Sequence, residues 1–361
     1  MSKDLSVFYD HQTMISQRIG GISRYHYELA VRLPKMGVDV NIACIRNINY
    51  YFSEMLGIHD RPESRSLVRL ISLLNKCNSL RRLRKHYDII HPTLYDPYLI
   101  GHCSGKLIVT VHDMMHEKGY VIDDKTVARK RRMVHAADRI ITVSQCTKND
   151  LLEYYPELDA EKIRVSHQGF SMSANDSKSR RFRFVDGPYI LFVGGRGGYK
   201  NFGRFVEAMK PILSSHKELQ VFCTGGEFTS EESELFGEYS SRFHSGKLID
   251  SEMSSAYANA LCFVFPSEYE GFGLPILEAF ACGCPVVCSS SSCFPEVAGD
   301  SAEYFDPLNV DEMSAKIQSV IDDDSLRESL SFRGRERLKL FDWDKTARET
   351  LEYYKEAISD D

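Results

Sequence analysis

The feature that most constrains the fold of this chain is a regular alternation of short apolar runs with amphipathic segments of helical length. β-branched and aromatic residues fill the short runs, as they do in the strands of sheets. Because a helical segment separates successive runs, the strands are expected to form parallel sheets covered by helices. The strands expected in the first half are Leu5–Tyr9, Val38–Cys44, Ile89–His91, Leu107–Val111, Arg139–Val143 and Ile163–His167. Those expected in the second half are Tyr189–Val193, Leu219–Thr224, Leu261–Phe265 and Pro285–Ser289.

The helices are predicted from apolar residues that recur with helical spacing. In the first half they are Ser23–Lys35, Leu67–Lys85, Lys125–Ala137 and Thr147–Tyr154. In the second half they are Phe202–Ser214, Ser251–Ala258, Pro275–Ala281, Val310–Ile321 and Arg335–Leu340.

A polar segment without periodicity, residues 173–188, separates the two halves and has the composition of a linker. The sequence therefore predicts an α/β chain with domains at 1–172 and 189–340 and a C-terminal helical segment at 341–361. Ligands of open parallel sheets bind outside the carboxyl ends of the strands, where the strand order reverses. We expect two such domains to face each other across a cleft lined by loops from both halves.

Composition narrows the class of protein. The chain has 361 residues, 43% hydrophobic and 27% charged, which is typical of a globular protein. The start has no basic segment followed by an apolar one, and no run approaches the ~20 apolar residues of a membrane span. The ten cysteines form no pair of CxxC motifs, so we expect reduced thiols in a cytosol and no zinc.

Charge is distributed unevenly along the chain. Residues up to Met172 include 25 Lys and Arg against 19 Asp and Glu, whereas the remainder has 20 against 32. A basic first half and an acidic second half suggest that different surfaces meet different partners. The basic excess is too small to indicate a nucleic-acid partner.

The most specific motif is FPSEYEGFGLPILEAFACGCPVVCS, residues 265–289. It begins after an expected strand and enters a helix that Pro275 suits at its first turn. Glu270 is expected in the loop and Glu278 in the helix. Gly271 and Gly273 allow close approach of the backbone to a ligand, and amides at a helix start are free to donate hydrogen bonds. Two carboxylates beside free amides suit a polyol such as a sugar or ribose. The alternative is that Glu270 is a surface charge and that Glu278 interacts with the helix dipole.

This stretch resembles the signature of the retaining glycosyltransferases of family 4, whose architecture, GT-B, consists of two Rossmann-like domains. Two glutamates in this spacing around a Glu-Gly-Phe-Gly turn define the resemblance. It implies that Glu278 holds the ribose of a nucleotide-sugar donor. It also implies that the transferred sugar is held by Glu270 and by the amides of Gly271, Phe272, Gly273 and Leu274. The final helix would then cross back to the first domain.

A glycine-rich turn, LFVGGRGGYKNF at residues 191–202, is the second motif. Arg196 and Lys200 extend from it beside free amides, an arrangement that suits a diphosphate. Its spacing is neither a Walker motif nor GxGxxG, and many such turns only connect elements. The family resemblance implies that both cations neutralise the departing diphosphate.

Three further motifs follow expected strands of the first domain. RIGGISRYHYELA offers Gly21 and Arg24, and the resemblance implies that the Gly21 amide touches the diphosphate. LIVTVHDMMHE places His112 and Asp113 at a strand end, and the resemblance implies that His112 contacts the transferred sugar. Ser144 is a candidate beside donor or acceptor, with helix capping as its alternative. His116 and Glu117 do not form HExxH, and no metal ligands are expected.

The reaction implied is transfer of a sugar from a nucleotide diphosphate, with retention of anomeric configuration and without a covalent nucleophile, cofactor or metal. Arg196 and Lys200 would stabilise the leaving group. No Asp-x-Asp pair is placed to bind a cation. The acidic run Asp322–Asp324 is expected to be solvated surface. The resemblance favours a GDP-sugar, GDP-mannose first, ahead of a UDP-sugar, in assembly of surface polysaccharides such as lipopolysaccharide. Two alternatives are a sugar-nucleotide 2-epimerase and a non-catalytic sugar-nucleotide-binding subunit.

A basic helix is predicted at residues 65–85, with apolar residues at Leu67, Leu70, Ile71, Leu74 and Cys77. Its cations are Arg65, Arg69, Lys76, Arg81, Arg82, Arg84 and Lys85. One interpretation is a core-facing helix with a solvated basic side. The other is that the helix binds an anionic membrane surface. This would hold a cytoplasmic enzyme peripherally at the inner membrane face, beside a lipid-linked glycan acceptor.

Overall fold

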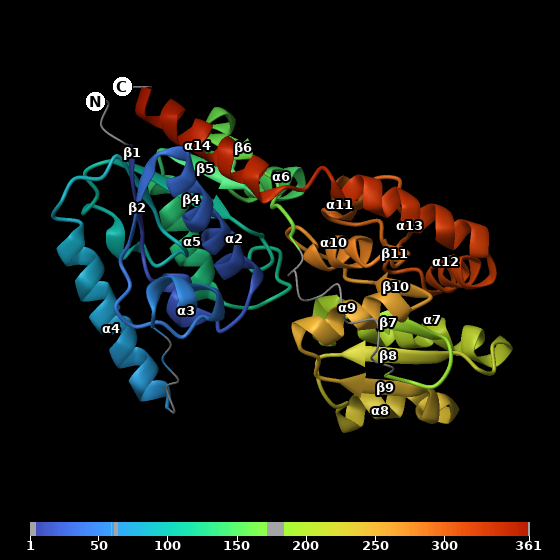
Figure 1. The fold of residues 1–361 in the computed structure, drawn as a ribbon. Coiled ribbons are helices and arrows are strands. Elements are labelled where there is room, and N and C mark those ends of the chain that lie inside the picture. The colour runs from blue at the N-terminus through green and yellow to red at the C-terminus, as the bar shows by residue number, and fades with distance from the viewer. Residues whose placement is uncertain (1–4, 59, 61–63, 172–183, 360–361) are drawn as a thin grey trace. The chain divides into compact units, whose positions relative to one another are not determined.

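Two compact units make up the chain (Figure 1). The computed structural model describes residues 5–58, 60, 64–171 and 184–359. The first unit comprises Met1–Gly169 together with Asp342–Asp361, and the second comprises Phe170–Phe341. Each unit contains a parallel sheet of six strands covered by helices, as the alternating pattern predicts.

The first sheet has the strand order β2-β1-β3-β4-β5-β6. Its strands are β1 (Leu5–Tyr9), β2 (Val38–Ile42), β3 (Ile89–His91), β4 (Lys106–Val111), β5 (Arg139–Thr142) and β6 (Ile163–Val165). The helices of this unit are α1 (Gln12–Ser16), α2 (Gly21–Arg32), α3 (Tyr50–Leu56), α4 (Arg65–Arg82), α5 (Asp124–Ala136), α6 (Gln145–Tyr154) and α14 (Trp343–Ser359). Central strands carry fully buried residues such as Val7, Ile89 and Ile108, which form the core of this unit.

Helix α14 belongs to the first unit although it follows the second in sequence. Its apolar face, including the buried Trp343 and Tyr354, joins a core cluster that also contains residues of α2 and β1. The Tyr354 hydroxyl lies 3.0 Å from that of Tyr9 and 2.5 Å from His91 Nδ1. Because burying a Tyr or Trp ring removes roughly 150–250 Å² from water, α14 is an integral part of this core.

The second sheet has the strand order β12-β11-β10-β7-β8-β9. Its strands are β7 (Tyr189–Phe192), β8 (Gln220–Thr224), β9 (Phe243–Gly246), β10 (Cys262–Phe265), β11 (Val286–Ser289) and β12 (Ala302–Phe305). The helices are α7 (Phe202–Ser215), α8 (Ser230–Phe236), α9 (Asp250–Asn259), α10 (Leu274–Ala281), α11 (Phe294–Ala298), α12 (Val310–Asp322) and α13 (Asp324–Leu338). The four residues of β7, β10 and β11 are all buried, which explains why these strands are evident in the sequence.

Some elements differ from the sequence predictions. The edge strands β9 and β12 were not predicted, because each buries only one or two of its four residues and offers little apolar signal. The short helices α1, α3, α8 and α11 were also missed. Helix α13 begins at Asp324, eleven residues before the predicted start, because Asp323 caps it by accepting a hydrogen bond from Leu326 N.

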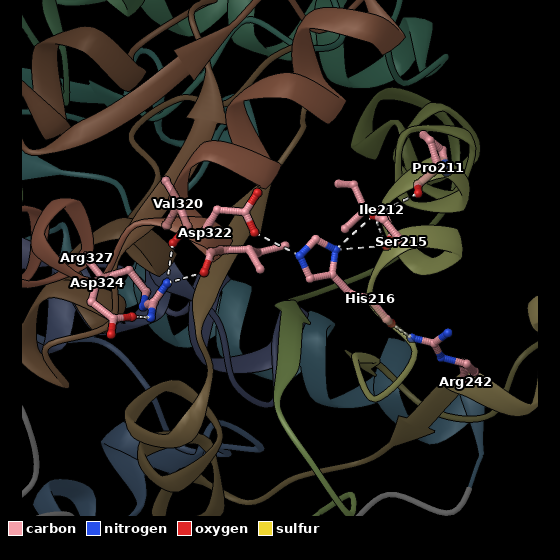
Figure 2. Close-up of polar contacts among 10 residues, drawn as sticks. Pro211, Ile212, Ser215, His216, Arg242, Val320, Asp322, Asp324 and Arg327 are labelled. Atoms are coloured by element: carbon pink, nitrogen blue, oxygen red, sulfur yellow. Dashed lines mark hydrogen bonds and ion pairs between the residues drawn. The ribbon is translucent and has the colours of Figure 1, made fainter.

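A group of polar contacts fastens α7 to α12 (Figure 2). His216 Nε2 lies 2.8 Å from Asp322 Oδ1, and Arg242 donates to the carbonyl of His216. Arg327 donates to the carbonyls of Val320 and Ile321 at the end of α12. The residues of the Asp322–Asp324 run are exposed, as expected, but they also cap and pair helices. Since α7 runs back from the carboxyl end of β7, these contacts lie at the opposite edge of the sheet from the candidate site.

Helix α4 packs with an unexpected face. Its buried side consists of Ile71, Asn75, Ser79 and the following Leu83, at a spacing of four residues. Asn75 Oδ1 accepts from Ile45 N at 2.8 Å, which fixes the helix through a polar contact. The interpretation that the predicted apolar stripe faces the core is therefore wrong for most of its members. The leucines that remain exposed are Leu67, Leu70, Leu73 and Leu74.

Candidate functional site

The second sheet reverses its strand order at β7, which pairs with β8 on one side and β10 on the other. The loops that follow β7 and β10 therefore lie next to each other at the carboxyl edge, where open α/β sheets bind ligands. The glycine-rich turn follows β7, and the Glu270 loop follows β10. The topology thus brings together the two strongest motifs of the sequence.

Lys200 and Glu270 meet at this edge. Lys200 Nζ donates to Glu270 Oε1 at 2.5 Å, and the two side chains are 19% and 15% exposed. Lys200 also lies 5.5 Å from the centre of the Phe265 ring. A partly exposed cation and carboxylate in contact can each be reached by a ligand that carries anionic and hydroxyl groups.

Glu278 follows Glu270 in the chain and lies on the next helix. It is on α10, which begins with Leu274 after Gly273, whose φ of +87° favours glycine. No side chain caps the start of α10, where Ile276 N donates to the carbonyl of Gly273 at 3.0 Å. Glu278 Oε2 accepts a hydrogen bond of 3.0 Å from the hydroxyl of Tyr257. This bond restricts the rotamers of the carboxylate.

The loop that joins Glu270 to α10 is packed against its own unit. Gly271, Phe272 and Gly273 are buried, and the Phe272 ring lies 5.8 Å from that of Phe341. The backbone of this segment is therefore fixed by a side chain that points into the protein. Such packing suits amides that must hold a sugar in one position.

Arg196 is not brought together with Lys200. Its guanidinium donates to the carbonyls of Thr224, Gly226 and Glu227 at 2.7–3.2 Å and to Glu232 at 2.9 Å. The side chain is 6% exposed and lies against the Phe228 ring. Arg196 therefore fastens the loop after β8 in this structure.

In the first unit, His112 lies directly after β4 and is buried. Neither ring nitrogen has a hydrogen-bond partner among the described residues. Burial, with the nearby Lys130 charge as the second cause, lowers the pKa of His112 to about 3. The ring is therefore neutral near pH 7, with one donor and one acceptor that lack partners. Buried polar atoms without partners are rare and call for an explanation.

The loop that carries His112 is held from behind. Lys130 is 1% exposed and donates to Glu117 Oε2 at 2.8 Å and to the Asp113 carbonyl at 2.9 Å. The hydroxyl of Tyr95 accepts from His112 N at 3.2 Å. These residues place His112 without touching its ring nitrogens.

The other candidates of the first unit have local partners. Gly21 is the first residue of α2, and Arg24 lies 3.7 Å from Glu28 one turn later. Asp113 Oδ1 accepts from Met115 N. The Ser144 hydroxyl accepts from Thr147 N at 3.0 Å and caps α6, which is the alternative role that the sequence offered.

Tyr257, Ser292 and Lys130 were not identified from the sequence. Each is separated by at least 17 residues from the candidate residue that it contacts. No spacing rule joins such residues, so only the fold could reveal them.

Two family models match the chain, and between them they account for most of it. The model described as Glycosyl transferases group 1 matches residues 174–337, and that described as Glycosyltransferase Family 4 matches residues 19–173. The chain belongs to the glycosyltransferases of these families. It is thus an enzyme, and its two α/β units are the domains of the GT-B fold.

Curated relatives are also sugar transferases. The O-antigen chain mannosyltransferase B of Escherichia coli is 31% identical over 260 residues, covering 70% of this chain and 61% of that protein. The D-inositol 3-phosphate glycosyltransferase of Paenarthrobacter aurescens is 25% identical over 390 residues, 94% of each chain. This chain thus spans less than two thirds of the E. coli relative.

Solved structures share the fold. The sucrose-phosphate synthase of Thermosynechococcus elongatus superposes with a TM-score of 0.76 at 20% identity, covering 99% of this chain and 100% of the other. The Anabaena protein HepE, solved with UDP and glucose, gives 0.72 at 16% identity, covering 97% and 99%. None of the helices that the structure describes has the length and apolarity needed to cross a membrane.

Proposed function

We propose that this enzyme transfers a hexose, with retention of configuration, from a GDP-sugar to a lipid-linked glycan of a surface polysaccharide. GDP-mannose is the donor that we favour. The similarity to an O-antigen chain mannosyltransferase supports mannose as the transferred sugar and a surface polysaccharide as the product. A UDP-sugar is the second candidate.

The observation that carries the proposal is the contact between Lys200 and Glu270 at the reversal of the second sheet, with Glu278 on the helix that follows the Glu270 loop. We assign Glu278 to the ribose of the donor and Glu270, with the amides of residues 271–274, to hydroxyls of the transferred sugar. Lys200 would exchange its contact with Glu270 for the diphosphate. Charge-assisted bonds of this kind are among the stronger contacts that a protein offers a ligand.

We assign His112 to a hydroxyl of the transferred sugar. Because its neutral ring has an unpartnered donor and an unpartnered acceptor, it can bond a hydroxyl in either direction. A charged imidazolium would repel the positive charge that develops on the sugar ring. The lowered pKa of His112 supports this role.

In the proposed reaction, the bond between the sugar and the diphosphate breaks as an acceptor hydroxyl attacks from the same face. The acceptor proton leaves with the departing phosphate oxygen, so no enzyme nucleophile is needed. Lys200 stabilises the negative charge of the leaving group, which is electrostatic catalysis. We propose that this cation replaces a metal ion, so that transfer persists in EDTA.

We also propose that α4 docks the enzyme on anionic lipid. The exposed Leu70 and Leu73 lie on the side opposite its buried face, and the exposed Leu74 lies on the flank next to them. Arg69, Arg81, Arg84 and Lys85 are exposed on or just after the same helix, which lies along the outside of the first unit in Figure 1. Leucines that insert beside cations, each worth on the order of 1 kcal/mol near anionic headgroups, suit reversible binding.

Co-sedimentation with phosphatidylglycerol vesicles at low and high salt tests this docking. Changing Leu70, Leu73 and Leu74 together to Ser, or Arg81, Arg84 and Lys85 together to Ser, should each weaken binding. Phe332→Ser is the matched control, because Phe332 is 61% exposed on α13 of the other unit. Failure of the unaltered protein to bind at low salt would favour a soluble acceptor.

The enzymatic proposal is tested with a panel of GDP- and UDP-sugars, each incubated with and without a lipid-linked glycan. Release of nucleotide only when acceptor is present, with product of the donor's anomeric configuration, supports it. Conversion of the donor alone to its 2-epimer would indicate the epimerase alternative. Binding without turnover would indicate a partner subunit.

A further inference from the structure

We propose that Ser292 is a positioning residue, whose hydroxyl holds the backbone of Glu270 so that its carboxylate meets the transferred sugar. The assignment of the sugar to Glu270 rests on the proposed function. The contact between the two residues is independent of it.

Ser292 has a strained backbone. Its φ is +59°, a left-handed conformation that side chains rarely adopt. Among the described residues, Asn201 is the other residue besides glycine with positive φ. Strained residues persist where their surroundings hold them, and they gather at functional sites. Since glycine would adopt this conformation at no steric cost, the side chain of Ser292 calls for a reason.

The hydroxyl of Ser292 supplies that reason. Ser292 Oγ accepts from Glu270 N at 3.2 Å and donates to Glu270 O at 2.5 Å. One hydroxyl thus satisfies both peptide groups of a single residue in a different loop. Ser292 follows β11 and Glu270 follows β10, and these strands are neighbours, so the two loops share the carboxyl edge of the sheet.

The start of the Glu270 loop has separate anchors. Asn201 Nδ2 donates to the carbonyls of Pro266 at 3.1 Å and Pro307 at 2.7 Å. Glu268 N donates to the carbonyl of Tyr199 at 2.8 Å. Removal of the Ser292 hydroxyl should therefore loosen Glu270 while the beginning of the loop stays in place. A displacement of about 1 Å at a reacting group can lower turnover about a hundredfold.

Two substitutions separate positioning from stability. Ser292→Gly removes the hydroxyl and also relieves the backbone strain, which offsets part of the loss of two hydrogen bonds, so it should melt above Ser292→Ala. Ser292→Ala removes the hydroxyl and keeps the strain, so it should melt lower. Both variants should lose turnover about tenfold or more with GDP-mannose. GDP alone lacks the transferred sugar, and its dissociation constant should change less than about twofold.

Hydrogen exchange of the Glu270 amide provides a measurement that does not depend on activity. In Ser292→Gly this amide should exchange about tenfold faster or more, while amides of β10 and β11 keep their protection. Unchanged exchange would overturn the proposal, and so would faster exchange with full turnover. If the unaltered enzyme uses no donor of the panel, the proposed function fails, and exchange still decides whether Ser292 holds Glu270.

Discussion

Lys200 Nζ and Glu270 Oε1 lie 2.5 Å apart, so the cation assigned to the diphosphate is paired with the carboxylate assigned to the sugar. Both side chains are mostly buried. The pair keeps each charge compensated. A nucleotide sugar could satisfy both at once, because it offers an anion to Lys200 and hydroxyls to Glu270.

The first prediction concerns Glu270→Gln, which keeps the shape of the side chain and removes its charge. Lys200 then loses a competing anion, so the affinity for GDP should stay equal or rise. Turnover should fall about tenfold or more, because the sugar loses a charged acceptor. Titration calorimetry with GDP and steady-state kinetics measure the two effects. Lys200→Met should weaken the binding of GDP. If both variants bind GDP more weakly, Lys200 does not exchange Glu270 for the diphosphate.

A second prediction concerns Tyr257, whose hydroxyl donates to Glu278 at 3.0 Å. Tyr257→Phe keeps the ring in the core and frees the carboxylate to adopt other rotamers. The affinity for GDP should fall about threefold to tenfold, as expected for a lost supporting hydrogen bond. Tyr239→Phe, at a half-buried tyrosine of the same unit, is the control. Unaltered affinity in Tyr257→Phe would mean that Glu278 needs no positioning.

The third prediction assigns Arg196 a role in stability. Arg196→Ala leaves three carbonyls and Glu232 without their donor, so the free energy of unfolding should fall by roughly 2 kcal/mol. In a domain of this size such a loss lowers Tm by about 4–8 °C. GDP affinity below the melting range should be unchanged. An unchanged Tm with lost turnover would instead show that Arg196 turns toward the diphosphate.

Acid sensitivity is the fourth prediction. Burial lowers the pKa of His91 and of His112 to about 3, against about 6.5 in the unfolded chain. The unfolded state therefore binds more protons between these values, and stability is lost as pH falls below about 6.5. Each histidine contributes up to about 1.4 kcal/mol per pH unit in that window. Between pH 7.5 and 5, the melting temperature of His112→Asn should fall less than that of the unaltered enzyme. An equal fall in both proteins would contradict a buried, neutral His112.

The sequence predicts the central strands and the placement of the main motifs for clear physical reasons. β7, β10 and β11 are buried on both faces and appear as continuous apolar runs. Loops at the carboxyl ends of such strands hold the candidates Lys200 and Glu270. Their contact also requires β7 and β10 to be neighbours in the sheet, which the structure shows.

Other features could not be predicted because their causes are not local. The spacing of Leu67, Leu70 and Leu74 indicates one face of α4, but Asn75 and Ser79 determine which face is buried. Ser292 carries no motif, and its importance rests on a backbone angle and on bonds to a residue 22 positions away. A guanidinium in a glycine-rich turn resembles a phosphate ligand, yet the carbonyls after β8 bind Arg196.

The proposed function depends most on Glu278 as the residue that holds the donor ribose. Titration of GDP-mannose, or of the donor that the panel selects, into the unaltered enzyme and into Glu278→Ala tests this directly. Loss of a charged hydrogen bond of about 1.5–3 kcal/mol should weaken binding about 10- to 150-fold. Glu234→Ala, at an exposed glutamate of α8, should bind as the unaltered enzyme does. Equal affinities of Glu278→Ala and Glu234→Ala would remove Glu278 from the site and contradict the proposed donor site.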